Sequence, residues 1–253
     1  MAQNSKIEWT HHTANLWWGC TKVHAGCDHC YAEALSNRWG NDVWGNDKPR
    51  KEIKSVWNDL AKYQKLAAQA CEMHRVFVGS MMDIFEKPMW LVDSKNNPVV
   101  GDTGSLRDKL FSQITEGSYP NLIFLLLTKR PSNINKYIPE SWKTNPPKNV
   151  MFGTSPVDQV TFDKLAMQLY LVKGKKFLSI EPQLSEIRIS LPYKIDWIIQ
   201  GGESGPNKRP FNLDWAYYMK RQCEQTGTPY FFKQIDKVQP IPKDLMVRQF
   251  PDN

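Results

Sequence analysis

The sequence predicts an α/β fold, a TIM-type (βα) barrel, partial or closed, with parallel strands. Short apolar runs recur along the chain and are separated by stretches with helical periodicity, an order that is typical of parallel strands joined by helices. The runs are continuously apolar, as expected for strands that are buried on both faces. A doubly wound sheet is the alternative that this pattern leaves open. The predicted strands are Asn15–Gly19, Arg75–Gly79, Leu122–Leu127, Val150–Gly153, Lys176–Ile180, Asp196–Gly201 and Pro229–Phe232.

Helical patterns fill most of the intervals between the predicted strands. Parallel neighbours need such crossovers, because the chain must return to the same end of the sheet before each new strand begins. The predicted helices are Tyr31–Trp39, Asp59–Cys71, Ser105–Glu116, Ile134–Ile138, Val160–Leu171 and Leu213–Thr226.

The chain of 253 residues has the length of a single α/β barrel. It contains no repeat or linker that would divide it, so one domain is predicted over residues 1–253. Two stretches, at about 39–54 and 90–104, carry turn residues without periodicity and are predicted as irregular insertions. Residues from about 236 to 253 are predicted as a C-terminal extension across the outside.

Charge and hydropathy indicate which partners and which cellular compartment to expect. The net charge of +7 and the pI near 9.1 suit a polyanionic partner. The first residues are polar and do not resemble a signal peptide, and the longest apolar run, Leu122–Leu127, is too short to cross a membrane. We therefore expect a cytoplasmic protein without a membrane partner, in a compartment that keeps thiols reduced.

Three of the five cysteines, Cys20, Cys27 and Cys30, fall within eleven residues in the spacing C-x6-C-x2-C. They lie on the loop between the first predicted strand and the first predicted helix. Three thiols cannot all pair as disulfides with one another, and the remaining cysteines, Cys71 and Cys223, are isolated in helical patterns. The cluster of thiols therefore indicates a metal site.

Two kinds of metal site fit this loop. Three thiolates can hold an iron–sulfur cluster and leave one iron without a protein ligand, which is then open to a cofactor or substrate. His24 and His29 also lie in the loop and could instead complete a Cys/His zinc site.

Polar or charged residues follow every predicted strand. Barrel enzymes place their chemistry at the carboxyl ends of the strands, so these residues are expected to meet at one end of the fold. The candidates are Ser80, Asp83, Lys129, Thr154, Ser155, Glu181, Gly201, Gly202 and Glu203.

A three-cysteine loop between the first strand and first helix of an α/β chain resembles the radical S-adenosylmethionine (radical SAM) superfamily. More closely, Ile7–Thr10, Gly19–Glu33 and Gly201–Pro206 resemble segments of a phage-associated family of radical-SAM-like three-cysteine proteins, and the resemblance runs through nearly the whole chain. The chain departs from the usual superfamily pattern because its first cysteine gap has six residues instead of three. His29 also stands where that pattern has an aromatic or apolar residue.

The resemblance implies a 4Fe-4S cluster held by Cys20, Cys27 and Cys30, with the amine and carboxylate of S-adenosylmethionine (SAM) on the open iron. Reductive cleavage of SAM would give methionine and a 5′-deoxyadenosyl radical, which abstracts a hydrogen from the substrate. An electron donor such as flavodoxin or ferredoxin is an implied partner. The family's association with phages implies a phage-encoded protein in the host cytoplasm.

Several residues are assigned to the SAM site by position. The superfamily holds the SAM amine with a turn after the second strand, where this chain has Ser80 and Asp83; the alternative is that Asp83 only caps the next segment. Thr154 and Ser155 are candidates for the ribose, with turn chemistry before a proline as the alternative. The assignment is completed by Gly201, Gly202 and His29.

Glu203, Lys129 and Glu181 are the candidate catalytic residues. Glu203 lies in a glycine-rich turn and would act on the substrate or the SAM amine, unless the motif is only a tight turn. Lys129 would contact a phosphate-bearing substrate, with a solvated surface position as the alternative. Glu181 ends a buried strand and is expected to face inward, because a buried charge needs a polar partner.

The expected activity is that of an isomerase or another radical SAM enzyme that modifies a nucleic-acid base or nucleotide. The phage association suggests rearrangement of a hypermodified pyrimidine in phage DNA. Tryptophans interleaved with basic residues around 38–57 would suit stacking on bases, although a core with a basic loop is an alternative. Two other functions stay open: a radical SAM enzyme for a peptide or small metabolite, and a zinc-stabilised nucleic-acid-binding protein without catalysis.

Overall fold

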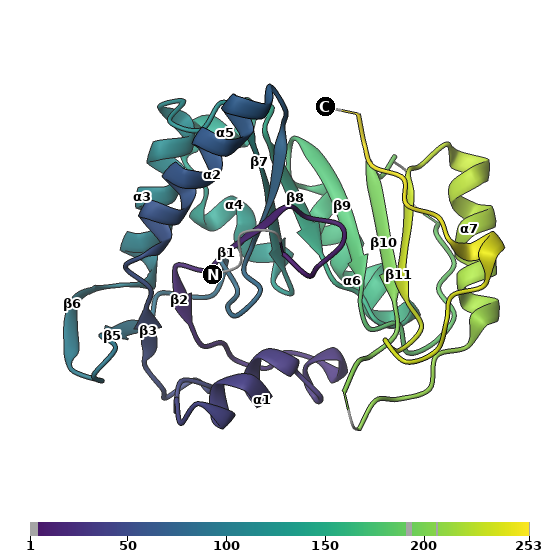
Figure 1. Ribbon diagram of the computed structural model, residues 1–253, viewed down its shortest axis with the longest axis horizontal. Helices are drawn as coiled ribbons and strands as arrows, with labels where there is room; N and C mark the ends of the chain where they lie inside the picture. The colour runs from purple at the N-terminus through teal and green to yellow at the C-terminus, as the bar shows by residue number, and fades with distance from the viewer. Residues whose placement is uncertain (1–4, 191–193, 206, 253) are drawn as a thin grey trace.

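A parallel sheet of seven strands, curled into a half-barrel, forms the centre of the fold (Figure 1). The computed structural model describes residues 5–190, 194–205 and 207–252. Met1–Asn4, Pro206 of the glycine-rich motif and Asn253 of the predicted extension lie outside the described residues. In spatial order the strands are β1 (His12–Ala14), β4 (His74–Val78), β7 (Leu122–Thr128), β8 (Val150–Thr154), β9 (Lys175–Ile180), β10 (Trp197–Gly201) and β11 (Tyr230–Gln234).

Every pair of neighbouring strands in this sheet is parallel. The predicted α/β class with parallel strands is therefore confirmed. The sheet is an open half-barrel whose edges are β1 and β11.

Both faces of the curled sheet are covered by apolar side chains, which explains why its strands are continuously apolar. One face packs against the helices. The other carries a separate cluster centred on Trp9, whose ring centroid lies 4.7 Å from that of Phe77 and 6.2 Å from that of Trp197. Trp9 precedes β1, so the N-terminal segment fills the hollow side of the half-barrel.

Along the chain, helices lie between successive strands of the large sheet except, among the described residues, between β9 and β10. In Figure 1, α2, α3 and α7 lie outside the curled sheet. Asp158 begins α6 with a capping box shared with Thr161, and Gly227 ends α7 in the left-handed conformation. The sequence did not predict α5. The helices are α1 (Tyr31–Arg38), α2 (Val56–Ala70), α3 (Thr103–Thr115), α4 (Ile134–Tyr137), α5 (Glu140–Thr144), α6 (Gln159–Tyr170) and α7 (Leu213–Thr226), with short 3-10 turns at Ala25–Cys27, Pro131–Asn133 and Lys243–Leu245.

The prediction of wholly irregular insertions at 39–54 and 90–104 is wrong, because both stretches contribute strands to a second sheet. These strands have only two to five residues, too few for a visible alternation of polar and apolar residues. The second sheet runs in the order β2 (Trp17–Trp18), β3 (Arg50–Glu52), β5 (Trp90–Val92) and β6 (Pro98–Asp102).

The predicted first strand, Asn15–Gly19, contains the short strand β2, but β2 lies in the second sheet and not in the large one. The chain leaves the large sheet at Asn15, whose side chain donates to Ser80 Oγ over 2.8 Å and accepts from the Met81 amide over 2.8 Å. The strand of the large sheet is the earlier β1, and the two tryptophans of β2 pair with β3 instead. The other six predicted strands overlap strands of the large sheet.

The chain after β11 passes back along that edge strand. Arg248 forms an antiparallel bridge with Phe231, and Leu245 is fully buried. Within residues 5–190, 194–205 and 207–252, none of the helices has the length and apolar character needed to cross a membrane.

Candidate functional site

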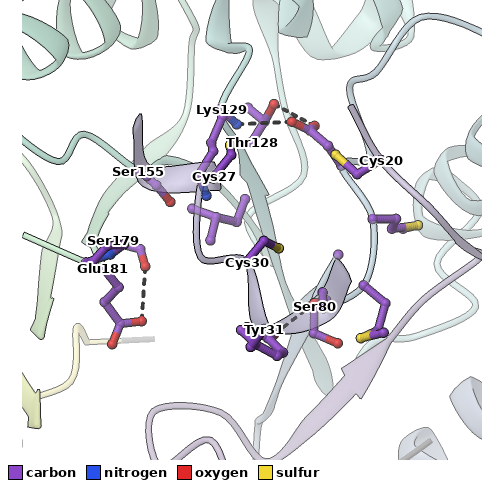
Figure 2. A pocket seen from close by; sticks show the side chains of 18 of the residues that line it. Cys20, Cys27, Cys30, Tyr31, Ser80, Thr128, Lys129, Ser155, Ser179 and Glu181 are labelled. Atoms are coloured by element: carbon purple, nitrogen blue, oxygen red, sulfur yellow. Dashed lines mark hydrogen bonds between the residues drawn. The ribbon is translucent and has the colours of Figure 1, made fainter. Parts of the chain in front are cut away.

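A cavity opens at the carboxyl ends of the large sheet's strands, between them and the loop that carries the three cysteines (Figure 2). Most of the polar residues predicted to meet at one end of the fold do line this cavity. Of the candidates at strand ends, the residues that line the cavity are Ser80, Asp83, Lys129, Ser155, Glu181, Gly202 and Glu203.

Cys20, Cys27 and Cys30 all line this cavity, and each is a free thiol. In Figure 2, Cys20 and Glu181 lie on opposite sides of it, with Cys27 and Cys30 between them. Tyr31 anchors the start of α1 beside the cavity, because its hydroxyl donates to the Ser80 carbonyl over 2.8 Å.

Gly19 allows the chain to enter the cysteine loop. Its φ is +117°, and a Cβ atom there would lie 2.3 Å from the Val43 carbonyl oxygen and 2.7 Å from Arg50 Cδ. A larger residue would have neither the backbone freedom nor the space. The position of Cys20 therefore depends on a glycine directly before it.

The donor set suits a thiophilic metal such as the iron of a cluster, because three thiols face one cavity. His29 also lines the cavity, but its Nδ1 lies 3.1 Å from Glu203 Oε2. His24 is not among the lining residues, and its Nδ1 accepts from the Gly26 amide over 3.1 Å. In the part of the chain that the structure describes, no three His, Cys, Asp or Glu side chains are close enough to hold a metal ion. The cluster remains a prediction.

Arg130, which directly follows Lys129 after β7, holds the first arm of the cysteine loop, the segment that begins at Cys20 and Thr21. Its Nη2 donates to the Thr21 carbonyl over 2.6 Å, and its Nη1 donates to Asp83 Oδ2 over 2.7 Å. The same Nη1 lies 3.9 Å from Cys20 Sγ. A single guanidinium thus joins the end of β7 to the predicted ligand.

Asp83 is engaged on both oxygens. Its Oδ1 accepts from the Thr128 hydroxyl over 2.7 Å and from the Phe85 amide over 3.0 Å. Its Oδ2 accepts from the Lys129 amide over 3.1 Å as well as from Arg130. Asp83 thus fastens the ends of β4 and β7 together, and its role in binding the SAM amine stays a prediction.

A second buried ion pair supports the same loop. Arg50 has no exposed surface and grips Glu86 with two hydrogen bonds, of 2.9 Å from Nε and 2.7 Å from Nη2. Its Nη2 also donates to the Thr21 hydroxyl over 3.0 Å, and its Nη1 to the Val43 carbonyl over 3.0 Å. Thr21 is therefore held by Arg130 through its carbonyl and by Arg50 through its hydroxyl.

The surroundings of Cys20 favour its protonated thiol over the thiolate. Burial raises its pKa to about 12, and the carboxylates of Asp83 and Glu86 add to the rise, whereas the charge of Arg130 opposes it. A metal that bound here would displace the thiol proton, as metals do when they bind cysteine.

Glu203 is held as a carboxylate. Burial alone would raise its pKa, but hydrogen bonds from the Arg209 side chain and amide and from His29 outweigh burial and lower the pKa to about 2. Arg209 also donates to the Ala25 carbonyl over 3.1 Å. His29 and Glu203, both predicted site residues, are thus partners of one another, and they join the cysteine loop to the turn after β10.

Glu181 faces inward, as its place at the end of a buried strand predicts. Its Oε1 lies 3.1 Å from Lys233 Nζ, and its Oε2 accepts from the Ser179 hydroxyl over 3.4 Å. Lys129 lines the other part of the cavity. Within the cavity the Glu181 carboxylate therefore has Lys233 as its partner, and Lys129 is a further lysine of the lining.

Thr154 and Gly201 were predicted for the cofactor site but are not among the lining residues. Thr154 is fully buried and donates to the Thr128 carbonyl over 2.8 Å, which ties β8 to β7. Gly202 does line the cavity, and a Cβ atom there would lie 2.1 Å from the Ile235 carbonyl oxygen. Its glycine is therefore required for packing against the segment after β11.

The sequence did not single out Glu86, and it did not reveal that Arg50, Arg130 and Arg209 support the cysteine loop. Arg50 was expected only as one of the basic residues around 38–57, and Arg130 and Arg209 only as positive charges at the mouth of the barrel. Buried charges need partners, but the sequence does not reveal which arginines are buried. The one available signal was the pair Lys129 and Arg130, directly after the most apolar strand.

Residues 4–248 match the model of a family described as "Protein of unknown function (DUF5131)". The chain belongs to this family. No curated protein and no solved structure matches the DUF5131 chain.

Proposed function

We propose that this DUF5131 chain is a radical SAM enzyme on a partial TIM-type barrel, and that it acts on a nucleic-acid base or nucleotide. The observation that carries the proposal is that three free cysteines from one loop line the cavity at the carboxyl ends of a curled parallel sheet. In barrels of parallel strands this end carries the chemistry.

Cys20, Cys27 and Cys30 would hold a 4Fe-4S cluster. When bound, the cluster and SAM supply the reductive cleavage of SAM to methionine and a 5′-deoxyadenosyl radical, which takes a hydrogen atom from the substrate. Reduced flavodoxin or ferredoxin would provide the electron. The protein residues bind and orient both groups.

Polar residues of the cavity would position SAM and the substrate. Ser80 follows β4 and Ser155 follows β8, two strands that are separated by β7, and both side chains would offer hydroxyls to the cofactor. Lys129 and Lys233 bring positive charge to the cavity, which suits the phosphate of a nucleotide. Glu181 neutralises Lys233 and would orient it.

Exposed aromatic side chains near the cysteine loop support a nucleic-acid substrate. The ring of Trp39 is 55% exposed and stacks on Trp18, with centroids 4.8 Å apart and planes 19° apart. Lys51 lies opposite Trp18 on β3. An exposed stacked ring, with a lysine on the strand that pairs with β2, would suit the bases and phosphates of a single strand.

The test is anaerobic incubation of the protein with SAM, dithionite and phage DNA, followed by mass analysis of 5′-deoxyadenosine and of the nucleosides. We expect two results. SAM is cleaved by the wild type but not by Cys27→Ala, and the DNA contains a changed pyrimidine nucleoside. Cys71→Ala is the matched control, because Cys71 is an exposed cysteine at the end of α2, far along the chain from the loop.

The outcomes separate the alternatives. Cleavage of SAM without any change in DNA would favour a peptide or small metabolite as substrate. Bound zinc, no iron and salt-dependent retention on DNA would favour a zinc-stabilised binding protein.

A further inference from the structure

Arg130 directs its guanidinium to the cysteine loop and to Asp83. Its side chain is only 14% exposed, and its two terminal nitrogens point to Asp83, the Thr21 carbonyl and the Cys20 sulfur. A guanidinium presents its donors in a rigid plane, so contacts on two sides fix both the arginine and the loop that it touches.

The charges around Arg130 are arranged in two unequal pairs. Arg50 donates two hydrogen bonds to Glu86, and its other guanidinium donors are directed to nearby backbone carbonyls and to the Thr21 hydroxyl. Arg130 has one hydrogen bond to Asp83 and lies 3.8 Å from Glu86, which leaves Nη1 facing Cys20. A negative charge gained by Cys20 would therefore fall beside Arg130.

We propose that Arg130 is a positioning residue for the predicted cluster: it holds the first arm of the cysteine loop and keeps a positive charge against the Cys20 sulfur. The inference rests on the proposed function, because it concerns a cluster at that site. Hydrogen bonds and positive charge next to cluster sulfurs raise the reduction potential, so Arg130 makes the cluster easier to reduce.

The first test uses the protein without metal. Amide hydrogen exchange in residues 20–24 is expected to accelerate about tenfold or more in Arg130→Met, because the Thr21 carbonyl loses a charged donor. Arg130→Lys keeps the charge but not the planar fork, and it is expected to show an intermediate rate. Arg188→Met removes an exposed arginine on the loop after β9 and should leave exchange in residues 20–24 unchanged.

The second test uses the reconstituted protein in a redox titration followed by electron paramagnetic resonance. Arg130→Met is expected to lower the equilibrium constant for cluster reduction about tenfold, which is a midpoint about 59 mV more negative for one electron. Arg188→Met should keep the wild-type midpoint. Arg130→Met leaves the buried Asp83 carboxylate without its ion-pair partner. If the single variant fails to fold for that reason, the double variant Arg130→Met with Asp83→Asn, which removes both charges, is used in its place.

The two tests fail in distinguishable ways. Wild-type protein that takes up no iron would contradict the proposed function, while exchange in residues 20–24 would still decide whether Arg130 holds the loop. Unchanged exchange in both Arg130 variants would overturn the positioning role. An unchanged midpoint in a loaded Arg130 variant would overturn the electrostatic role.

Discussion

Arg209 holds the Glu203 carboxylate with both its guanidinium and its backbone amide, the latter over 2.8 Å. The same guanidinium donates to the Ala25 carbonyl in the middle of the cysteine loop. The loop is therefore fastened along its length. Arg130 and Arg50 hold Thr21 at its start. Arg209 holds Ala25 in its middle, and His29 contacts Glu203 further along.

The contact between Arg209 and Glu203 should matter for cluster retention. Arg209→Met is expected to reduce iron retention about 10–100-fold, as loss of residues that orient metal ligands commonly does. Lys208→Met is the matched control, because Lys208 pairs with Asp236 at 3.2 Å instead of with the loop. Iron released to a chelator over time measures the effect. Equal release from wild type and Arg209→Met would show that this contact does not support the site.

The buried pair of Arg50 and Glu86 is expected to be the most sensitive electrostatic contact of the second sheet. Arg50→Met leaves the Glu86 carboxylate buried without its main partner, and it should lower the free energy of unfolding by about 3–5 kcal/mol. The double variant Arg50→Met with Glu86→Leu should recover part of that loss. Urea unfolding at pH 7 measures both. If Arg50→Met were as stable as wild type, the pair of Arg50 and Glu86 would add nothing to stability.

Gly19 and Gly40 provide a matched pair of substitutions. Both have positive φ, at +117° and +69°, but of the two only Gly19 has neighbouring atoms within 4 Å of the place that a Cβ atom would take. Gly40→Ala should cost about 1 kcal/mol for backbone strain alone. Gly19→Ala should cost clearly more and weaken iron binding, because it displaces Cys20. Similar unfolding midpoints for the two variants would contradict the close approach of Val43 and Arg50.

A histidine cluster at the start of β1 and β4 predicts acid sensitivity that is independent of the cavity. His12 stacks on Tyr63 with centroids 4.0 Å apart, and its Nε2 lies 3.1 Å from His74 Nδ1. Burial, with the added charge of His74, lowers the pKa of His12 to about 4. Burial and the nearby Arg75 likewise lower the pKa of His11 to about 4.

The sign of the pH effect follows from these lowered values. Above pH 6.5 the histidines are neutral in both the folded and the unfolded chain, so they do not change stability. Between pH 6.5 and 4 the unfolded chain takes up protons that the folded chain does not, and stability falls by up to about 1.4 kcal/mol per pH unit for each ring. The variant His12→Phe keeps the stacked ring and should show a shallower loss in thermal unfolding. An identical slope in wild type and His12→Phe would exclude this cause.

The large sheet could be predicted because its strands carry a strong local signal. All five residues of β8 are buried, and so are six of the seven residues of β7, the most apolar strand. β1 escaped detection because His12 and Thr13 are polar residues that are buried by stacking and by contact with β4. No periodic pattern marks such a strand.

The charged network around the cysteines could not be predicted, because it depends on pairing between distant segments. Arg50 lies thirty residues after Cys20 and reaches the cysteine loop only because β2 and β3 pair with Trp18 opposite Lys51. The strand-end residues, by contrast, follow from a general rule for parallel sheets, and Ser80, Glu181 and Glu203 do meet in one cavity.

The central claim is most directly tested by the iron and acid-labile sulfide content of the anaerobically reconstituted protein. We predict about four irons and four sulfides per chain in wild type and in Cys71→Ala. The variants Cys20→Ala, Cys27→Ala and Cys30→Ala should each lose most of this content. Wild-type protein that binds zinc and no iron, or a Cys27→Ala variant that keeps the full complement, would contradict the account.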